Sequence, residues 1–128
     1  MGANPMFIAS PENFFGNGAT ANTAKDGSGT IVDLTGAAPS SGLRIDDLTL
    51  AATGNTTAGS VSFFIYNGAT WKFWRAVSVP AITASATVPP FTINWSNLAL
   101  VLKSGWKLGF APYNAESFNV HVTRAGTF

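Results

Sequence analysis

The sequence predicts an all-β fold: a single-domain antiparallel β-sandwich, jelly-roll-like, of about eight strands, with an extended N-terminal arm. Three observations support this prediction. Short segments alternate apolar and polar residues, and turn residues separate them at intervals of about 8–12 positions. No segment keeps the apolar period of a helix over a useful length. Long connections near residues 36–42, 53–58 and 80–90 suit Greek-key crossovers better than a simple meander.

Residues 1–20 are predicted to form the arm, and residues 21–128 the sandwich domain. The arm is rich in Asn, Ala, Gly and Pro, which favour an extended segment or loop, with room for one short strand. It nevertheless contains Phe7, Phe14 and Phe15, whose exposure to water is unfavourable. We therefore expect the arm to dock on its own domain or on a neighbouring molecule.

Two strands are predicted after the arm, at residues 30–35 and 43–52. The apolar alternation of the second strand changes phase across Asp46 and Asp47. A β-bulge at this point, with one extra residue in the strand, restores the phase. With the bulge, four apolar residues share one side of the strand: Leu43, Ile45, Leu48 and Leu50.

The clearest element is a hairpin at residues 59–79, whose strands flank Asn67 and Gly68. Asn-Gly predicts a type I′ turn, because both central residues of that turn need positive φ. Alternation assigns these residues to the core face: Val61, Phe63, Ile65, Trp71, Phe73, Val77 and Val79. It assigns these to the outer face: Ser62, Phe64, Tyr66, Lys72, Trp74, Ala76 and Ser78. An outer face with three large aromatic rings predicts a contact surface for another protein, since such a face is usually polar.

Four more strands are predicted, at residues 91–95, 98–102, 106–111 and 117–124. The loop before them has room for an edge strand at residues 82–88. Lys103, Ser104 and Gly105 are typical of the turn in a bulged hairpin. In the last strand, alternation points Phe118, Val120 and Val122 inward. It points Asn119, His121 and Thr123 outward.

The charge content is low for a chain of 128 residues, which fits one ordinary domain. Charged residues make up 10% of the sequence, against about 25% in a typical soluble domain. A Thr/Ser/Asn/Gly surface is one explanation, and a surface covered in an assembly is the other. Combined with the aromatic hairpin, the low charge predicts a homo-oligomer. The net charge of +1 and the scattered basic residues argue against nucleic acid as a partner.

Cysteine is absent, so the chain has neither disulfides nor thiolate metal ligands. Residues 1–15 lack the basic and apolar regions of a signal peptide, so synthesis in the cytoplasm is expected. No apolar run approaches the roughly 20 residues of a membrane span, so no membrane partner is expected.

Candidate catalytic groups are few, and we expect no enzymatic activity. His121 is the single histidine and lies at an outward position, without a G-x-S-x-G nucleophile motif elsewhere. There are six carboxylates: Glu12, Asp26, Asp33, Asp46, Asp47 and Glu116. Asp46 and Asp47 are adjacent, so a regular strand would point them to opposite faces, whereas a bulge would bring them closer. A salt bridge to Arg44 or Lys72, or a solvated edge, is the favoured interpretation, and a small hydrolase remains an alternative.

Two further patterns have simple explanations. Asp26 to Gly29 resembles half of a calcium loop but lacks the remaining oxygen ligands, so a turn is favoured and no cofactor or metal is expected. Four tryptophans would allow sugar stacking in a carbohydrate-binding β-sandwich: Trp71, Trp74, Trp95 and Trp106. The first two fall on opposite faces of a regular strand, and the other two have apolar neighbours that favour a core or rim position.

Four runs within residues 20–124 carry a family resemblance: AKDGSGTIVDLTGA, GLRIDDLTLAATGNTTAGSVSFFIYNG, VLKSGWKLGF and YNAESFNVHV. In their pattern and order the chain resembles small structural proteins of tailed bacteriophages, of the capsid decoration (cement) type. The resemblance implies a β-sandwich that binds the major capsid protein on the outer shell of the virion, often as a trimer. Such a protein is made in the host cytoplasm and stabilises the shell by bridging its subunits. A tail- or fibre-associated virion protein is the alternative.

Aromatic side chains are the expected anchors of such an interface, because buried aromatic residues near its centre carry much of the binding energy. The candidates lie in the outer face of the hairpin and in the arm: Phe64, Tyr66, Trp74, Phe7, Phe14 and Phe15. Packing within the chain itself is the alternative for each of them.

Overall fold

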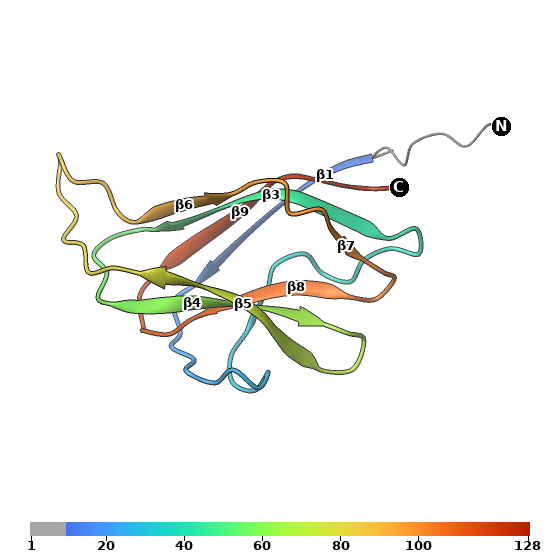
Figure 1. The fold of residues 1–128 in the computed structure, drawn as a ribbon, viewed down its shortest axis with the longest axis horizontal. Helices are drawn as coiled ribbons and strands as arrows, with labels where there is room; N and C mark the ends of the chain where they lie inside the picture. The colour runs from blue at the N-terminus through green and yellow to red at the C-terminus, as the bar shows by residue number, and fades with distance from the viewer. Residues whose placement is uncertain (1–9) are drawn as a thin grey trace.

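The computed structural model describes residues 10–128 as two antiparallel sheets packed face to face (Figure 1). Sheet A contains five strands: β1 (Ser10–Gly18), β3 (Leu43–Ala52), β6 (Thr92–Trp95), β7 (Leu100–Leu102) and β9 (Phe118–Thr127). Sheet B contains four strands: β2 (Val32–Asp33), β4 (Gly59–Tyr66), β5 (Trp71–Val79) and β8 (Lys107–Pro112). The predicted β-sandwich is therefore confirmed.

The strand pairs are nested along the sequence: the first strand pairs with the last, and each further pair lies between the strands of the pair before it. β1 pairs with β9, β2 with β8, β3 with both β6 and β7, and β4 with β5. Sheet A has the order β1-β9-β3-β6, with β7 beside β3, and sheet B has the order β2-β8-β4-β5. This order is that of a jelly roll, in which a long folded ribbon of strand pairs rolls into two sheets. No helix that could cross a membrane occurs within residues 10–128.

The core between the sheets comes from alternating positions of the central strands. Phe63 and Phe110 from sheet B are fully buried against sheet A. The predicted bulge in β3 is confirmed by register shifts on both sides of Asp47 in its pairing with β9. All four apolar residues that the bulge was expected to align are buried: Leu43, Ile45, Leu48 and Leu50. Each inward residue predicted for β9 is buried too: Phe118, Val120 and Val122.

Half of the predicted arm is a strand of the sandwich. β1 pairs with β9 from Ser10 to Gly18, with one irregularity between Glu12 and Phe14. The sequence pattern indicates this strand only weakly, because its Asn, Gly and Pro residues disfavour strands and because the adjacent Phe14 and Phe15 break the simple alternation. An edge position tolerates such residues, since only one side of the strand is hydrogen-bonded to a neighbour.

The hairpin of β4 and β5 is present, but the predicted type I′ turn is wrong. The connection has four residues, Asn67 to Thr70, and only Gly68 among them has positive φ, at 89°. The Asn67 side-chain oxygen accepts hydrogen bonds from the backbone amides of Ala69 (3.1 Å) and Thr70 (2.9 Å). Asn67 thus forms an Asx-type turn, which the same dipeptide supports as well.

A bulge in β5 changes which side chains face the core. Phe63 pairs with Arg75 and Phe64 pairs with Phe73, so Trp74 is the extra residue. The predicted parity is therefore wrong for the first half of β5. Trp71 and Phe73 lie with Tyr66 and Phe64 on the outer face, whereas Trp74 packs against the core cluster. Because Trp71, Phe73 and Trp74 place large aromatic residues at both parities, the apolar alternation does not reveal this bulge.

Two other connections differ from the predictions. Lys103 to Gly105 do form a tight turn, in which Trp106 N donates to Lys103 O at 3.0 Å. The turn joins β7 in sheet A to β8 in sheet B, so it is an arch between sheets and not a hairpin. The predicted edge strand at 82–88 reduces to one bridge, between Thr56 and Ile82.

Residues 19–31, here called the strap, join β1 to β2 and lie against the outer face of sheet B. Lys25 Nζ donates to Ser62 Oγ at 3.1 Å, and Asn22 N donates to Pro112 O at 2.8 Å. The buried Asn22 amide closes the strap on itself by donating to the backbone oxygens of Ser28 (2.9 Å) and Thr30 (3.0 Å). The strap therefore adds a third layer over part of the sandwich.

Candidate functional site

The predicted anchors do not form one surface. Phe7 lies outside the described residues. Phe14 is partly buried against the core. Phe64 has no exposed surface: the Phe73 ring meets it edge to face, and Lys25 of the strap lies 5.1 Å from the centre of the Phe73 ring. Phe64 is thus unavailable to a partner in this structure. Tyr66 and Trp74 are partly buried at the surface, and Phe15 is the most exposed of the five described anchors, at 56%.

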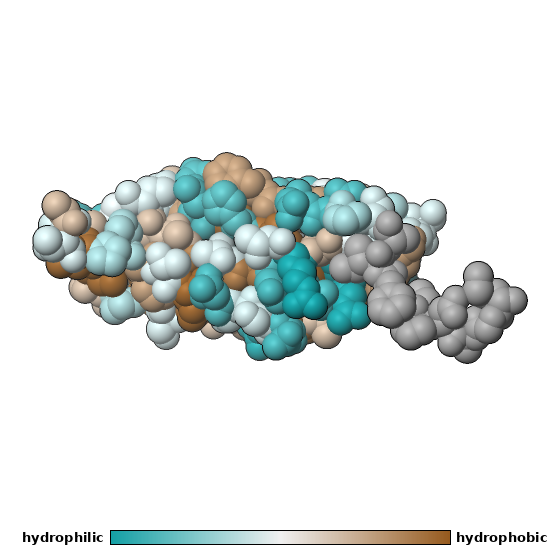
Figure 2. Space-filling view, turned by 90° about the horizontal axis from the view of Figure 1, so that it is seen from above, coloured by the Kyte–Doolittle hydropathy of each residue, from teal (hydrophilic) through white to brown (hydrophobic). Residues whose placement is uncertain are grey.

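Phe15 lies on the outer face of sheet A, which is otherwise largely polar. Seen from the side of β3 and β6, hydrophilic and hydrophobic side chains intermix without one dominant apolar patch (Figure 2). The Asn17 amide donates to Asn119 Oδ1 at 2.7 Å, and Thr49 Oγ1 donates to Asn94 Oδ1 at 2.6 Å. These bonds pair neighbouring strands on a face exposed to water.

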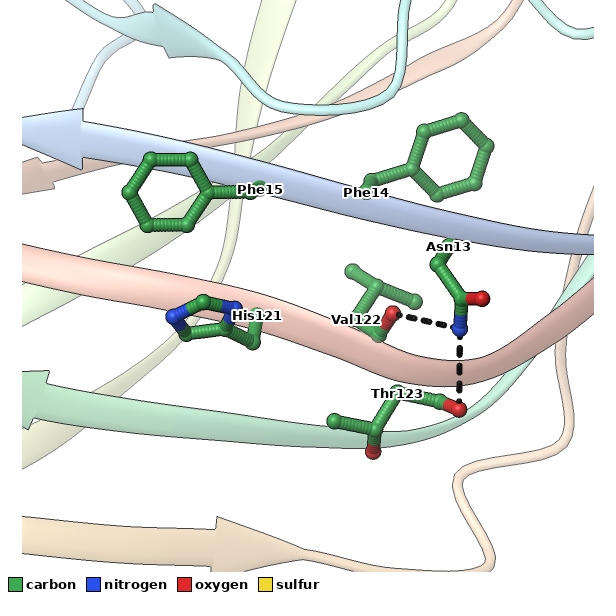
Figure 3. Close-up of a pocket in the computed structure, with 6 residues that line it drawn as sticks. All are labelled: Asn13, Phe14, Phe15, His121, Val122 and Thr123. Carbon is green, nitrogen blue, oxygen red and sulfur yellow. Dashed lines mark hydrogen bonds between the residues drawn. The ribbon is translucent and has the colours of Figure 1, made fainter.

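A shallow groove of about 350 Å³ runs between β1 and β9 on this face (Figure 3). The rings of Phe15 and His121 lie side by side, with their centroids 4.6 Å apart. The Asn13 amide donates to the backbone oxygens of Val122 (3.4 Å) and Thr123 (3.1 Å). No carboxylate lines the groove, so His121 has no acidic partner there to orient its ring for base catalysis.

The outer face of sheet B carries a second aromatic group. The rings of Tyr66 and Trp71 meet edge to face at 5.3 Å, and those of Phe64 and Phe73 at 6.0 Å. Lys107 Nζ lies 4.6 Å from the centre of the Tyr66 ring, a cation–π contact. The Trp71 ring lies across Gly109, whose missing side chain leaves room for it. Most rings of this second group therefore already have contact partners within the chain.

A third group lies where both sheets end, along the edge strands β5 and β6. We call it the aromatic edge and define it by Trp74, Trp95, Trp106, Lys72, Arg75 and Lys103. The Trp74 and Trp95 rings meet edge to face at 6.4 Å, and Trp95 also packs on Phe63 at 4.9 Å. The Arg75 guanidinium lies 4.9 Å from the centre of each of these two tryptophan rings.

A groove of about 270 Å³ opens on this edge. Its walls are mostly apolar and come from β4, β5 and the end of the arch: Ile65, Asn67, Lys72, Phe73, Trp74 and Trp106. Lys103 Nζ lies 5.8 Å from the Trp106 ring centre, beyond the groove. The three tryptophans of the aromatic edge are partly buried. Packing therefore holds each ring in position, while part of the ring surface stays accessible.

The adjacent Asp46 and Asp47 form ion pairs with different arginines. Asp46 pairs with Arg44 at 2.9 Å, as expected, whereas Asp47 lies 3.9 Å from Arg124. Asp47 Oδ1 also accepts a hydrogen bond from the backbone N–H of Asn97 at 3.1 Å. Within the part of the chain that the structure describes, no three His, Cys, Asp or Glu residues gather as metal ligands do.

Asp26 belongs to a turn in the strap, as the sequence favours. Its Oδ1 accepts hydrogen bonds from Ser28 Oγ (2.6 Å) and Ser28 N (3.0 Å). These two bonds stabilise the charged carboxylate, and they lower the pKa of Asp26 below its ordinary value.

Sequence reasoning placed Trp95 and Trp106 in a core or rim, and the rim is where they lie. It missed their association with Arg75 and Lys103, because the contacts of Trp95 with β5 depend on how the two sheets close. Comparison with protein-family models and with the curated proteins gives no match, so neither comparison establishes a family for this chain.

Proposed function

We propose that this protein is a non-enzymatic structural component of a tailed bacteriophage: a decoration protein that binds the major capsid protein on the outer shell. The observation that carries the proposal is the aromatic edge, where three partly buried tryptophans lie beside three cations. Tryptophan and arginine are the residues most enriched among energetically dominant interface contacts.

The aromatic edge suits a docking role because its rings are held in place before a partner arrives. Trp95 packs on the buried Phe63, and Arg75 stacks on both Trp74 and Trp95. Little side-chain freedom is then lost on binding, and that loss is one of the main costs of association. In this proposal Trp74 remains an anchor and is joined by Trp95 and Arg75 in place of the buried Phe64, whereas Tyr66 lies outside the aromatic edge.

No chemistry is needed for the proposed role. A protein that binds only the assembled shell stabilises that shell by mass action, since assembly creates the binding site. Bridging requires contacts with more than one capsid subunit, and an interface of standard size covers about 800 Å² on each partner. A homo-oligomer, with a trimer favoured, would provide several such contacts at once.

The test is a cryo-electron microscopy reconstruction of particles that contain this protein. We expect density on the outer capsid surface, at positions shared by several subunits, with the aromatic edge turned toward the shell. Density on the tail alone would replace this proposal with the fibre-type alternative. Density on the shell with the aromatic edge facing solvent would keep the decoration role but reject this contact surface.

A further inference from the structure

We propose that the aromatic edge binds an extended, acidic peptide segment of its partner, which adds to sheet B along the free side of β5. This inference rests on the proposed function, because it takes the partner to be a protein. It adds the chemistry of the partner segment, which the proposed function leaves open.

The distribution of ion pairs points to an acidic partner. All six carboxylates and all seven basic residues lie within the described residues 10–128. The ion pairs there use Arg44, Lys107 and Arg124, and Lys25 donates to Ser62 in the strap layer. Within residues 10–128, four basic residues form no ion pair: Lys25 in the strap, and Lys72, Arg75 and Lys103, which all belong to the aromatic edge. Their charge is therefore not neutralised by the chain and is complementary to carboxylates.

The groove favours an apolar side chain between those carboxylates. Its walls include Ile65, Phe73 and Trp106, and its polar groups are few. The Asn67 side-chain oxygen is already occupied by two backbone amides of its own turn. A sugar ring needs several directed hydrogen bonds, whereas an apolar side chain needs mainly contact area. The lining therefore favours a peptide over a glycan.

The position of β5 explains why the segment should be extended. β5 is the last strand of sheet B, and within residues 10–128 no strand pairs with its outer side. Free backbone groups on such an edge can pair with an added strand, and pockets beside the edge then select its side chains. The bulge at Trp74 and the nearby Lys72 and Arg75 discourage indiscriminate pairing, because bulges and charges protect edge strands.

Peptide binding tests the inference directly. The probe is a fluorescein-labelled nonapeptide of alternating Glu and Val with Phe at its centre, and the comparison peptide has Lys in place of every Glu. Fluorescence anisotropy should show the acidic peptide binding at least about ten-fold more tightly than the basic one, and less tightly as salt increases. Equal binding of both peptides, or no binding of the acidic peptide at millimolar concentration, would overturn the inference.

Charge reversal locates the binding site. Arg75→Glu should weaken binding of the acidic peptide about ten-fold or more. Arg124→Glu makes the same change of charge on the far face of sheet A, where Arg124 is exposed, and should leave binding nearly unchanged. Circular dichroism of both variants establishes that they are folded. Equal weakening by the two variants would show that only net charge matters and would reject the site.

The two proposals fail separately. If the acidic peptide does not bind but Arg75→Glu still releases the protein from capsids, the decoration role stands and the partner segment is not of this kind. If the acidic peptide binds selectively but particles carry the protein only on the tail, the peptide site stands and the capsid proposal falls.

Discussion

The outer faces of the two sheets differ in how far their outward-pointing phenylalanines are exposed to water. On sheet A, hydrogen-bonded Asn and Thr side chains meet water, and Phe15 remains 56% exposed beside His121. On sheet B, Phe64 has no exposed surface; the Phe73 ring meets it, and the strap contacts this face through Lys25, at Phe73 and Ser62. Both phenylalanines point away from the core between the sheets. An outward position in a strand therefore says nothing about exposure until the connections that cross that face are known.

The largest expected difference between the two faces comes from removing these two rings. Phe64→Ala should lower the free energy of unfolding by about 3–5 kcal/mol, because it empties a fully buried site. Phe15→Ala should change it by no more than about 0.5 kcal/mol, since the exposed ring contributes mainly one surface contact. Urea unfolding of both variants measures the contrast. Similar losses would mean that the strap does not cover sheet B in solution.

Crowding the layer over sheet B should have the next largest effect. A Cβ added at Gly109 would lie 2.7 Å from Val32 O and 2.8 Å from the Trp71 ring. We expect Gly109→Ala to destabilise the fold by about 1–3 kcal/mol, as overpacking does. Gly54→Ala is the matched control, because no heavy atom lies within 4 Å of its added Cβ. Thermal unfolding compares the two, and an unchanged midpoint for Gly109→Ala would show that Trp71 does not lie across this residue.

Loosening the strap should have a smaller, local effect. Asn22→Ala leaves the backbone oxygens of Ser28 and Thr30 without their side-chain donor, at a cost of about 0.5–1.5 kcal/mol, because water can replace that donor at these exposed residues. Amide hydrogen exchange should accelerate in the strap and around Phe64 more than in β3 and β9. Asn13→Ala removes comparable bonds on the exposed face of sheet A and should change exchange little. Uniform acceleration in Asn22→Ala would indicate that the strap unfolds only together with the sandwich.

The smallest effect concerns pH. Hydrogen bonds from Ser28 lower the pKa of Asp26 in the folded chain relative to the unfolded chain. The charged carboxylate therefore stabilises its turn above the unfolded pKa, and this contribution is lost as pH falls through the folded pKa. The Ser28 amide resonance should shift with pH at a midpoint below that of an ordinary aspartate, and this shift should vanish in Asp26→Asn. A midpoint at the ordinary value would contradict the hydrogen bonds described.

The sequence predicted the fold best where alternation was clean. β3 and β9 follow from their apolar positions, including the bulge at Asp46 and Asp47, because one face of each strand is polar. The prediction for Trp74 was wrong, because aromatic residues occupy both faces of β5 and the apolar alternation does not show the change of parity. The turn at 103–105 was predicted, but as part of a hairpin and not as a connection between sheets. Local turn residues do not determine which sheet the next strand joins.

The candidate site was predicted only in part, for a related reason. Tyr66 and Trp74 were singled out and do lie at the surface, but the aromatic edge depends on contacts between segments far apart in sequence. Arg75 meets Trp95 only when sheet B closes over sheet A. Likewise, the strap that contacts the outer face of sheet B has the sequence of an ordinary loop.

The nested pairing of strands implies an order of folding. The β4–β5 hairpin closes a four-residue loop, whereas the register that joins Ser10 to Thr127 spans almost the whole chain. Forming the inner pair first shortens the loops that later pairs must close, which lowers the entropy cost of each step. We expect pulse-labelled hydrogen exchange during refolding to protect β4 and β5 first and β1 last. Early protection of β1 would point to a different nucleus, and the last strand to fold should also be the first to detach under force.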